Sequence, residues 1–253
     1  MKKNLILWEG NSLLDNAPIA VIALLSSNNR KTGDNGTKNM VQTVIIRTDV
    51  DPVTASKNKQ DESICGSCIH RQSLGGACYV NLGQMPLSVY RAYKRGSYEY
   101  LSDMNKHWLY GRALRLGAYG DPAAIPVKVW SNVINDCKIS HYTGYTHQLN
   151  YKKNGFKFDQ ELTNFCMISA DTPKQAKKIR DLGYRTFRVK TENSPIMANE
   201  IECLSDTKNI KCIDCGLCDG IGKNKTSIVI DIHGSRKKSY VNKYEKVNIS
   251  ALA

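Results

Sequence analysis

Seven of the nine cysteines fall into two tight groups, and this clustering constrains the chain more than any other feature of its sequence. The first group is Cys65, Cys68 and Cys78, and the second is Cys203, Cys212, Cys215 and Cys218. The N-terminal stretch lacks a signal-peptide pattern and the apolar runs are too short to cross a bilayer, so we expect a cytoplasmic protein without a membrane partner. Clustered thiols in a reducing compartment favour metal binding over disulfides.

The second group has enough ligands to saturate a metal centre. Four cysteines can close a tetrahedral zinc site or bind the four irons of a [4Fe–4S] cluster. His233 is an alternative fourth zinc ligand beside Cys212, Cys215 and Cys218, and it would leave Cys203 free. We favour iron–sulfur, because the CxxCxxC run resembles the bacterial ferredoxin pattern.

The first group has one ligand too few for a closed site. Three thiolates leave one iron of a [4Fe–4S] cluster open, and substrate or cofactor binds at such a position. A zinc site would need His70 as its fourth ligand. The group follows an early buried strand, on the side of a parallel sheet where active sites collect.

The composition of the 253-residue chain is that of a globular protein, with 41% hydrophobic and 23% charged residues. The net charge of +13 predicts attraction to polyanions, and nucleic acid is therefore a candidate partner. The alternative is that the charge only keeps the protein in solution. Cys137 and Cys166 stand alone in apolar surroundings, and we expect both to be buried.

Apolar runs alternate with helical patterns along the chain, which is typical of an α/β fold built from parallel βαβ units. We expect strands over 19–25, 41–47, 114–118, 139–145, 165–169 and 185–189, and helices over 86–95, 126–134 and 174–182. An incomplete β/α (TIM-like) barrel is the architecture we expect. Residues 1–200 would form this barrel-like domain, 201–236 a metal-binding cysteine loop packed on it, and 237–253 a polar tail.

Polar residues stand out at the ends of three expected strands. Asp121 follows the strand 114–118 in a Gly-Asp-Pro turn. Simple helix capping does not explain an Asp at this position, so Asp121 is the candidate catalytic residue. Asp171 or Thr172 is explained as the N-cap before Pro173. His147 ends a polar aromatic stretch that begins after His141, and it is a candidate contact to a base or cofactor.

Several segments resemble an uncharacterised family of cysteine-rich bacteriophage proteins, akin to the gene product 88 group. They are Lys31-Thr32-Gly33, Cys65-Gly66-Ser67-Cys68, Ala77 to Asn81, Gly117 to Pro122, Tyr142 to His147, Tyr184 to Val189 and the closing Cys215-Gly216-Leu217-Cys218 loop. The resemblance implies a phage or prophage origin, hence the cytoplasm of an infected bacterial host, and brings no settled activity.

A second resemblance is to the radical S-adenosylmethionine (SAM) enzymes. Those enzymes hold a [4Fe–4S] cluster on three cysteines after the first barrel strand, and a Gly-Gly-Glu-Pro-like turn after the second strand meets the methionine amino group. Gly120-Asp121-Pro122 is similar to that turn. The four-cysteine group resembles the cysteines that bind auxiliary clusters in those enzymes. The resemblance implies that Gly120 and Asp121 contact SAM. The cysteine spacing differs: the family has CxxxCxxC, and here CxxC is followed by a distant Cys78.

Three functional hypotheses follow. The first is a radical-SAM-like iron–sulfur enzyme acting on an unknown substrate, such as a nucleic acid or nucleotide. The second is a zinc-containing nucleic-acid modifying enzyme resembling the tRNA-guanine transglycosylases, with Asp121 or Asp171 as nucleophile and zinc on Cys212, Cys215, Cys218 and His233. The third is a non-catalytic phage protein that binds nucleic acid and is stabilised by its metals.

Overall fold

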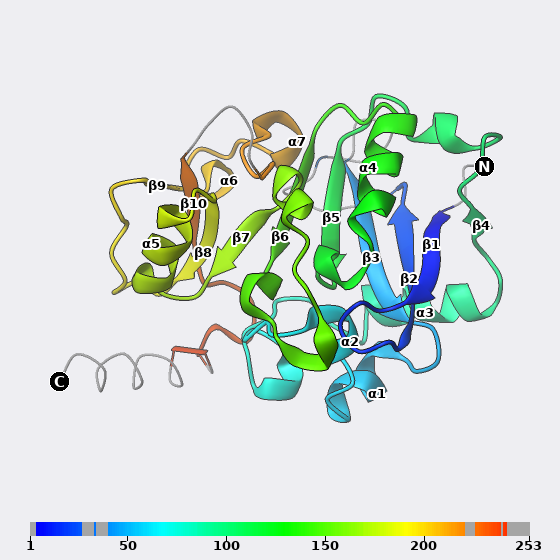
Figure 1. Cartoon of the computed structure of the whole chain (residues 1–253), viewed down its shortest axis with the longest axis horizontal. Helices are drawn as coiled ribbons and strands as arrows, with labels where there is room; N and C mark the ends of the chain where they lie inside the picture. Colours follow the sequence, from blue (N-terminus) through cyan, green and yellow to red (C-terminus); the bar gives the residue numbers. More distant parts are fainter. Residues whose placement is uncertain (1–3, 27–32, 34–39, 221–225, 239, 242–253) are drawn as a thin grey trace.

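Two largely apolar runs form strands in the interior of the sheet. β2 (Pro18–Leu24) and β3 (Val41–Arg47) are buried along nearly their whole length, as expected of strands covered on both faces. The computed structural model describes residues 4–26, 33, 40–220, 226–238 and 240–241. Within them one α/β domain contains a ten-stranded sheet (Figure 1).

The strands lie in the order β4-β1-β2-β3-β5-β6-β7-β8-β10-β9. Of the ten, β2 alone runs against the others, because its pairings with β1 and β3 are antiparallel and the other pairings are parallel. The remaining bounds are β1 Leu5–Asn11, β4 Glu99–Tyr100, β5 Leu114–Tyr119, β6 Tyr142–Thr146, β7 Met167–Ala170, β8 Thr186–Lys190, β9 Glu200–Glu202 and β10 Ser227–Asp231.

Helices cover both faces of this sheet. The α-helices are α1 Pro52–Lys57, α2 Glu62–Cys65, α3 Met85–Lys94, α4 Val127–Asp136, α5 Pro173–Asp181, α6 Leu204–Thr207 and α7 Cys212–Cys215. Short 3-10 turns span Gln72–Leu74, Lys106–Trp108, Pro122–Ala124, Gln148–Asn150, Lys153–Gly155 and Gln160–Asn164. None of the helices in the described part of the chain combines the length and apolarity that crossing a bilayer requires.

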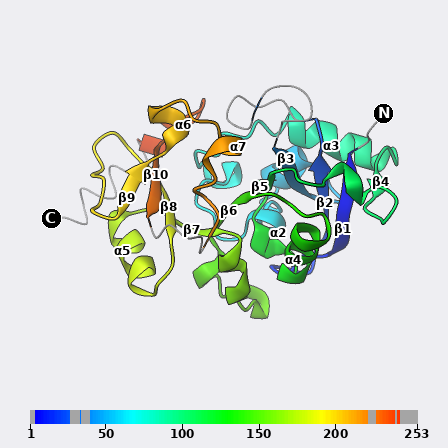
Figure 2. The same cartoon turned by 90° about the horizontal axis from the view of Figure 1, so that it is seen from above.

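Strand register assigns α4 and α5 to one face. α4 packs in the cluster that contains Leu114, and α5 packs on Ile168. Leu114 pairs with Tyr142 and Ile168 with Thr146, so both residues lie on the same face as the even-numbered residues of β6. α6 and α7 lie on the opposite side of the sheet (Figure 2).

The predicted α/β fold class is confirmed. The predicted TIM-like barrel is not confirmed, because the sheet is open, with β4 and β9 at its two edges. The six expected strands and three expected helices are present with bounds shifted by up to three residues. The segment 201–236 is more than a cysteine loop, because β9 ends within it and β10 joins the same sheet. Most of the expected tail lies outside the described residues, but Tyr240 is buried against Ala77 and Ile232.

A buried ion pair secures the β9 edge. Arg188 of β8 donates to both carboxylate oxygens of Glu200 in β9, at 2.9 Å and 2.6 Å. Arg188 is 1% exposed, and Glu200 lies three residues before Cys203. The pair therefore fixes the strand that leads into the second cysteine group.

Replacing Glu200 by Gln should lower the free energy of unfolding by about 3–5 kcal/mol, because Arg188 would keep a buried charge without its partner. Urea denaturation measures the change. The control is Asp181→Asn, which breaks the exposed Lys177–Asp181 pair on α5 and should cost less than about 1 kcal/mol. Equal effects of the two substitutions would contradict this account of the β9 edge.

Candidate metal centres

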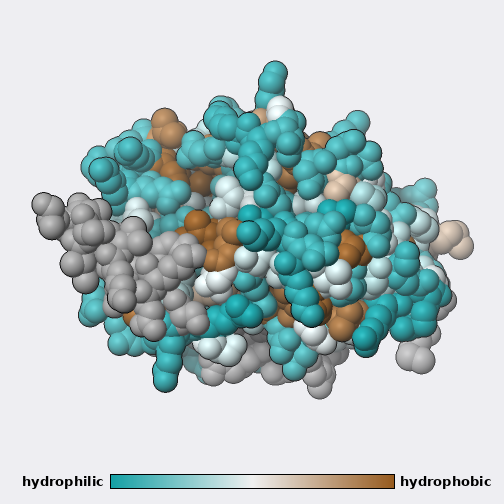
Figure 3. Space-filling view, turned by 90° about the horizontal axis from the view of Figure 1, so that it is seen from below, coloured by the Kyte–Doolittle hydropathy of each residue, from teal (hydrophilic) through white to brown (hydrophobic). Residues whose placement is uncertain are grey.

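Parallel strands bring four polar loops to one edge of the sheet. The loop with the first cysteine group follows β3, Asp121 follows β5, His147 follows β6 and Asp171 follows β7. The carboxyl ends of parallel strands meet at a common edge, and ligands bind there in α/β proteins. This edge is seen from below in Figure 3, where the described surface is largely hydrophilic with separate hydrophobic patches.

The first cysteine group closes into a compact loop. Cys65 ends α2, and the Cys68 N–H donates to the Cys65 carbonyl at 3.1 Å. The Cys78 N–H donates to the His70 carbonyl at 2.8 Å, and this bond holds Cys78 close to the Cys65–Cys68 turn. Burial raises the pKa of the Cys65 thiol well above its usual value, and the charges of Cys68 and Cys78 raise it further. The three partly buried thiols therefore lie close enough to interact with one another.

A side chain that the sequence did not single out braces this loop. Gln148 is fully buried; its amide donates to the Cys65 carbonyl at 3.0 Å, and its carbonyl oxygen accepts from the Ser67 N–H at 3.0 Å. Gly66 has φ +50, and a Cβ there would overlap the Gln148 side chain. Only the tertiary fold brings residue 148 to residue 66, so local sequence signals do not reveal the brace.

Gln148 is itself held by Asp121. Asp121 Oδ2 accepts from the His147 N–H and from the Gln148 amide, both at 2.8 Å, and Asp121 Oδ1 accepts from the Ala123 N–H at 3.0 Å. The last bond is a helix cap, which the sequence analysis did not expect of this residue. The catalytic and SAM-binding roles of Asp121 and Gly120 stay predictions; the contacts show that Asp121 positions His147 and Gln148.

Asp171 meets two histidines at the same edge. Its Oδ1 lies 3.3 Å from His147 Nε2 and 3.6 Å from His70 Nε2. Burial raises the pKa of Asp171, but the hydrogen bond and charge of His147 outweigh it and lower that pKa overall. Thr172, not Asp171, caps α5 by accepting from the Gln175 N–H. His147 also hydrogen-bonds Cys68, so this group adjoins the first cysteines.

The second cysteine group surrounds a cavity on the face opposite α4 and α5. Cys212 and Cys215 lie one helical turn apart in α7, and Gly216 (φ +64) turns the chain so that Cys218 faces them. All four cysteines line a small cavity of about 30 Å³ together with Thr143, Tyr145 and Ile228. Burial, together with the charges of the other three cysteines, raises the pKa of Cys218 to about 12, although the contact with Tyr145 lowers it.

Arg185 anchors the loop that carries this group. Its guanidinium donates to the carbonyl oxygens of Leu217 and Gly220, and pairs with Asp219 at 2.6 Å. The Gly144 N–H of β6 donates to the Cys218 carbonyl at 3.1 Å. The thiols of the second group are therefore fixed against the sheet by a buried cation and by a strand.

A row of polar side chains runs between the two groups. Tyr79, next to Cys78, accepts a hydrogen bond from Arg115 at 2.7 Å. Tyr145 hydrogen-bonds the Cys218 thiol, and Arg115 interacts with both Tyr145 and Cys212. His233 packs on the Tyr79 ring, with centroids 5.3 Å apart, rather than lining the four-cysteine cavity.

Ligand spacing differs between the thiol groups and the histidine group. All seven clustered cysteines are described, yet no three of their Sγ atoms lie within 4.8 Å of one another. His70, His147 and Asp171 do offer three ligand atoms within that distance.

No protein-family model, curated protein or solved structure matches the chain. The resemblances noted from the sequence therefore stay predictions.

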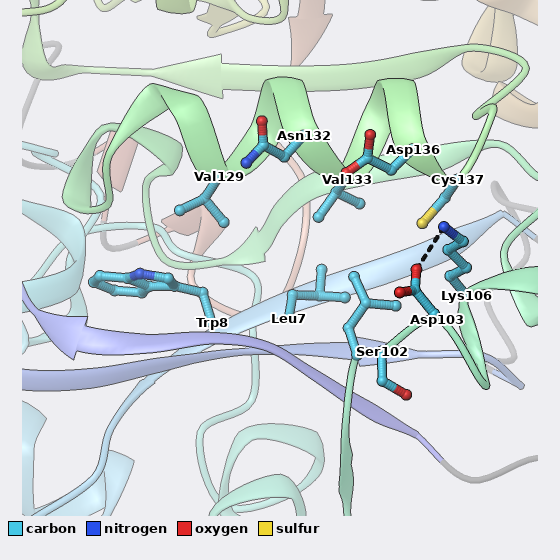
Figure 4. Close-up of a pocket in the computed structure, with 11 residues that line it drawn as sticks. Leu7, Trp8, Ser102, Asp103, Lys106, Val129, Asn132, Val133, Asp136 and Cys137 are labelled. Carbon is cyan, nitrogen blue, oxygen red and sulfur yellow. Dashed lines mark ion pairs between the residues drawn. The ribbon is translucent and has the colours of Figure 1, made fainter.

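A further groove lies apart from the cysteine groups. It runs between β1, α4 and the segment 101–106, and its lining includes Leu7, Trp8 and Val133 (Figure 4). Lys106 pairs with Asp103 at 2.7 Å on its rim. None of the seven clustered cysteines lines this groove, whereas the unclustered Cys137 is buried at its end. Cys166 is likewise buried, as expected.

Replacing Asp121 by Asn should destabilise the protein by about 1–3 kcal/mol, because the new amide would point N–H groups at buried donors. Chemical denaturation of the purified protein measures the loss. Asp159→Asn is the matched control: Asp159 also caps a 3-10 turn, but its side chain is exposed and should matter much less. An unchanged midpoint for Asp121→Asn would refute the bracing role.

Proposed function

We propose that this chain is an iron–sulfur protein with two clusters, one held by Cys65, Cys68 and Cys78 and one by Cys203, Cys212, Cys215 and Cys218. The spacing of the thiols carries the proposal. Tetrahedral zinc with Zn–S bonds of about 2.3 Å draws its thiolates to within about 3.8 Å of one another. In both groups each set of three thiols has at least one pair of Sγ atoms more than 4.8 Å apart, which fits ligands placed around a multi-iron cluster better than ligands around one ion.

The four-cysteine group suits a structural cluster. It supplies one thiolate for each iron of a [4Fe–4S] cluster, and the cavity between the thiols is lined mainly by apolar side chains such as Leu204, Ile210 and Ile228. A saturated site contributes its binding free energy to folding. Arg185 and Gly144 hold the loop in place, so loss of a ligand here should disturb the fold.

The three-cysteine group suits a reactive cluster. Three thiolates leave one iron with an open position, and such an iron binds a ligand that carries nitrogen or oxygen donors. The group lies at the carboxyl edge of the sheet, beside His147 and Asp171. The protein residues then hold this cluster, orient His147 through Asp121, and provide groups that can exchange protons with a bound molecule.

A radical-SAM-like reaction is the enzyme hypothesis compatible with this arrangement. Six parallel strands, β3-β5-β6-β7-β8-β10, lie side by side in chain order, with α4 and α5 on one face and the second cysteine group on the other. An incomplete β/α barrel has that order, which supports the hypothesis. SAM at the open iron, near Gly120, is the cofactor that it implies.

The zinc alternative has less support. It requires His233 beside Cys212, Cys215 and Cys218, but His233 packs on Tyr79 and no such set of ligand atoms converges within 4.8 Å in the described residues. It also leaves the first cysteine group without a role. Nucleic-acid binding rests on the net charge of +13 and stays a prediction.

Single cysteine replacements test the proposal. Anaerobically purified protein should contain about eight iron and eight sulfide ions, as two [4Fe–4S] clusters require. Cys68→Ala should stay folded and retain about half of the iron, because the second cluster is intact. Cys215→Ala should be insoluble or unstable, because the structural cluster contributes to folding.

Cys137→Ala is the control, since Cys137 is buried but belongs to neither group. It should keep the full iron and sulfide content. Stoichiometric zinc without sulfide in the wild-type protein would rule out the proposal. Collapse of Cys68→Ala together with an intact Cys215→Ala would show that the roles of the two groups are reversed.

A further inference from the structure

We propose that His70, His147 and Asp171 bind a single divalent transition-metal ion, separate from both cysteine groups. The three residues come from three loops at the carboxyl edge of the sheet, after β3, β6 and β7. Their ligand atoms lie within 4.8 Å of one another. Since none of these ligands is a thiolate of the proposed clusters, the site does not depend on those clusters.

The distances indicate convergence on a common point rather than simple pairing. One oxygen, Asp171 Oδ1, faces both imidazoles, at 3.3 Å from His147 Nε2 and 3.6 Å from His70 Nε2. The His147 contact is a long hydrogen bond, and the His70 contact lies beyond hydrogen-bond range. The two rings stand edge to face with centroids 5.7 Å apart, so they approach the carboxylate from different directions. A metal ion between the three atoms would satisfy all of them at once.

Outer contacts hold each of the three residues in place. The His147 N–H donates to Asp121, and the Asp171 N–H donates to the Gln175 side chain at 2.8 Å. The His70 ring packs on Tyr240, with centroids 5.1 Å apart. The three side chains are between 13% and 17% exposed, so the group is mostly shielded from water. Such outer-shell support is typical of metal ligands in proteins.

The donor set defines the class of ion. Two imidazoles and one carboxylate suit iron(II), zinc, cobalt or manganese better than magnesium or calcium, which prefer oxygen ligands. Three protein ligands leave further coordination positions for water or a substrate. Cys68 hydrogen-bonds His147 but is not a member of the converging group. The ion would therefore lie next to the first cysteine group without sharing its thiols.

Cobalt(II) titration of the purified protein tests the site, with visible absorption and calorimetry as readouts. The wild-type protein should bind one equivalent with nitrogen and oxygen ligation. Asp171→Asn and His70→Gln should each weaken binding about tenfold or more, since losing a direct ligand costs at least as much as losing an outer-shell partner. Cys65→Ala should keep this equivalent, because Cys65 is not one of its ligands.

His107→Gln is the matched control, because His107 is exposed and belongs to the distant 3-10 turn at Lys106–Trp108. It should bind cobalt as the wild type does. Iron and sulfide are measured in the same samples, so a failure of the cluster proposal is recognised independently of the cobalt result. Wild-type affinity in both Asp171→Asn and His70→Gln, or no cobalt binding by the wild type, would overturn the assignment.

Discussion

The common direction of nine strands is the constraint on which the candidate sites depend. Because β3, β5, β6 and β7 run the same way, the loops that follow them all emerge at one edge of the sheet. Residues far apart in sequence, such as Cys68, His147 and Asp171, become neighbours for this reason. The one reversed strand, β2, lies outside this set and does not disturb the edge.

Buried hydrogen bonds made by Asp121 and Gln148 fix the positions of these neighbouring loops. Asp121 accepts from the His147 backbone and from the Gln148 amide, and Gln148 in turn holds the Cys65–Ser67 turn. Three loops are thereby locked to one another by groups that cannot be left unpaired in the interior. Arg185 serves the second cysteine group in the same way, by binding the carbonyl groups of its loop. Each thiol group thus has its own polar support.

The sequence predicted what depends on local pattern and missed what depends on tertiary contact. Alternation and turn chemistry predicted the strands from 114 to 189 and a cap of α5 at Asp171 or Thr172, of which the structure uses Thr172. The two cysteine groups are evident from their spacing in the sequence, and their metal binding stays a prediction. β1 was missed because Trp8, Glu9 and Gly10 break its apolar run, although pairing with β2 stabilises it. The contacts of Gln148, of Arg185 and of the two histidines with Asp171 could not be predicted, because the partners lie 24 or more residues apart in the sequence.

X-ray absorption at the iron and zinc edges of anaerobically purified protein tests the central claim most directly. The claim is that both thiol groups are spaced for multi-iron clusters rather than for single ions. The account predicts iron in stoichiometric excess over the chain, with sulfur and further iron atoms as neighbours. Zinc with sulfur neighbours alone, at about 2.3 Å and without a second metal, would contradict it.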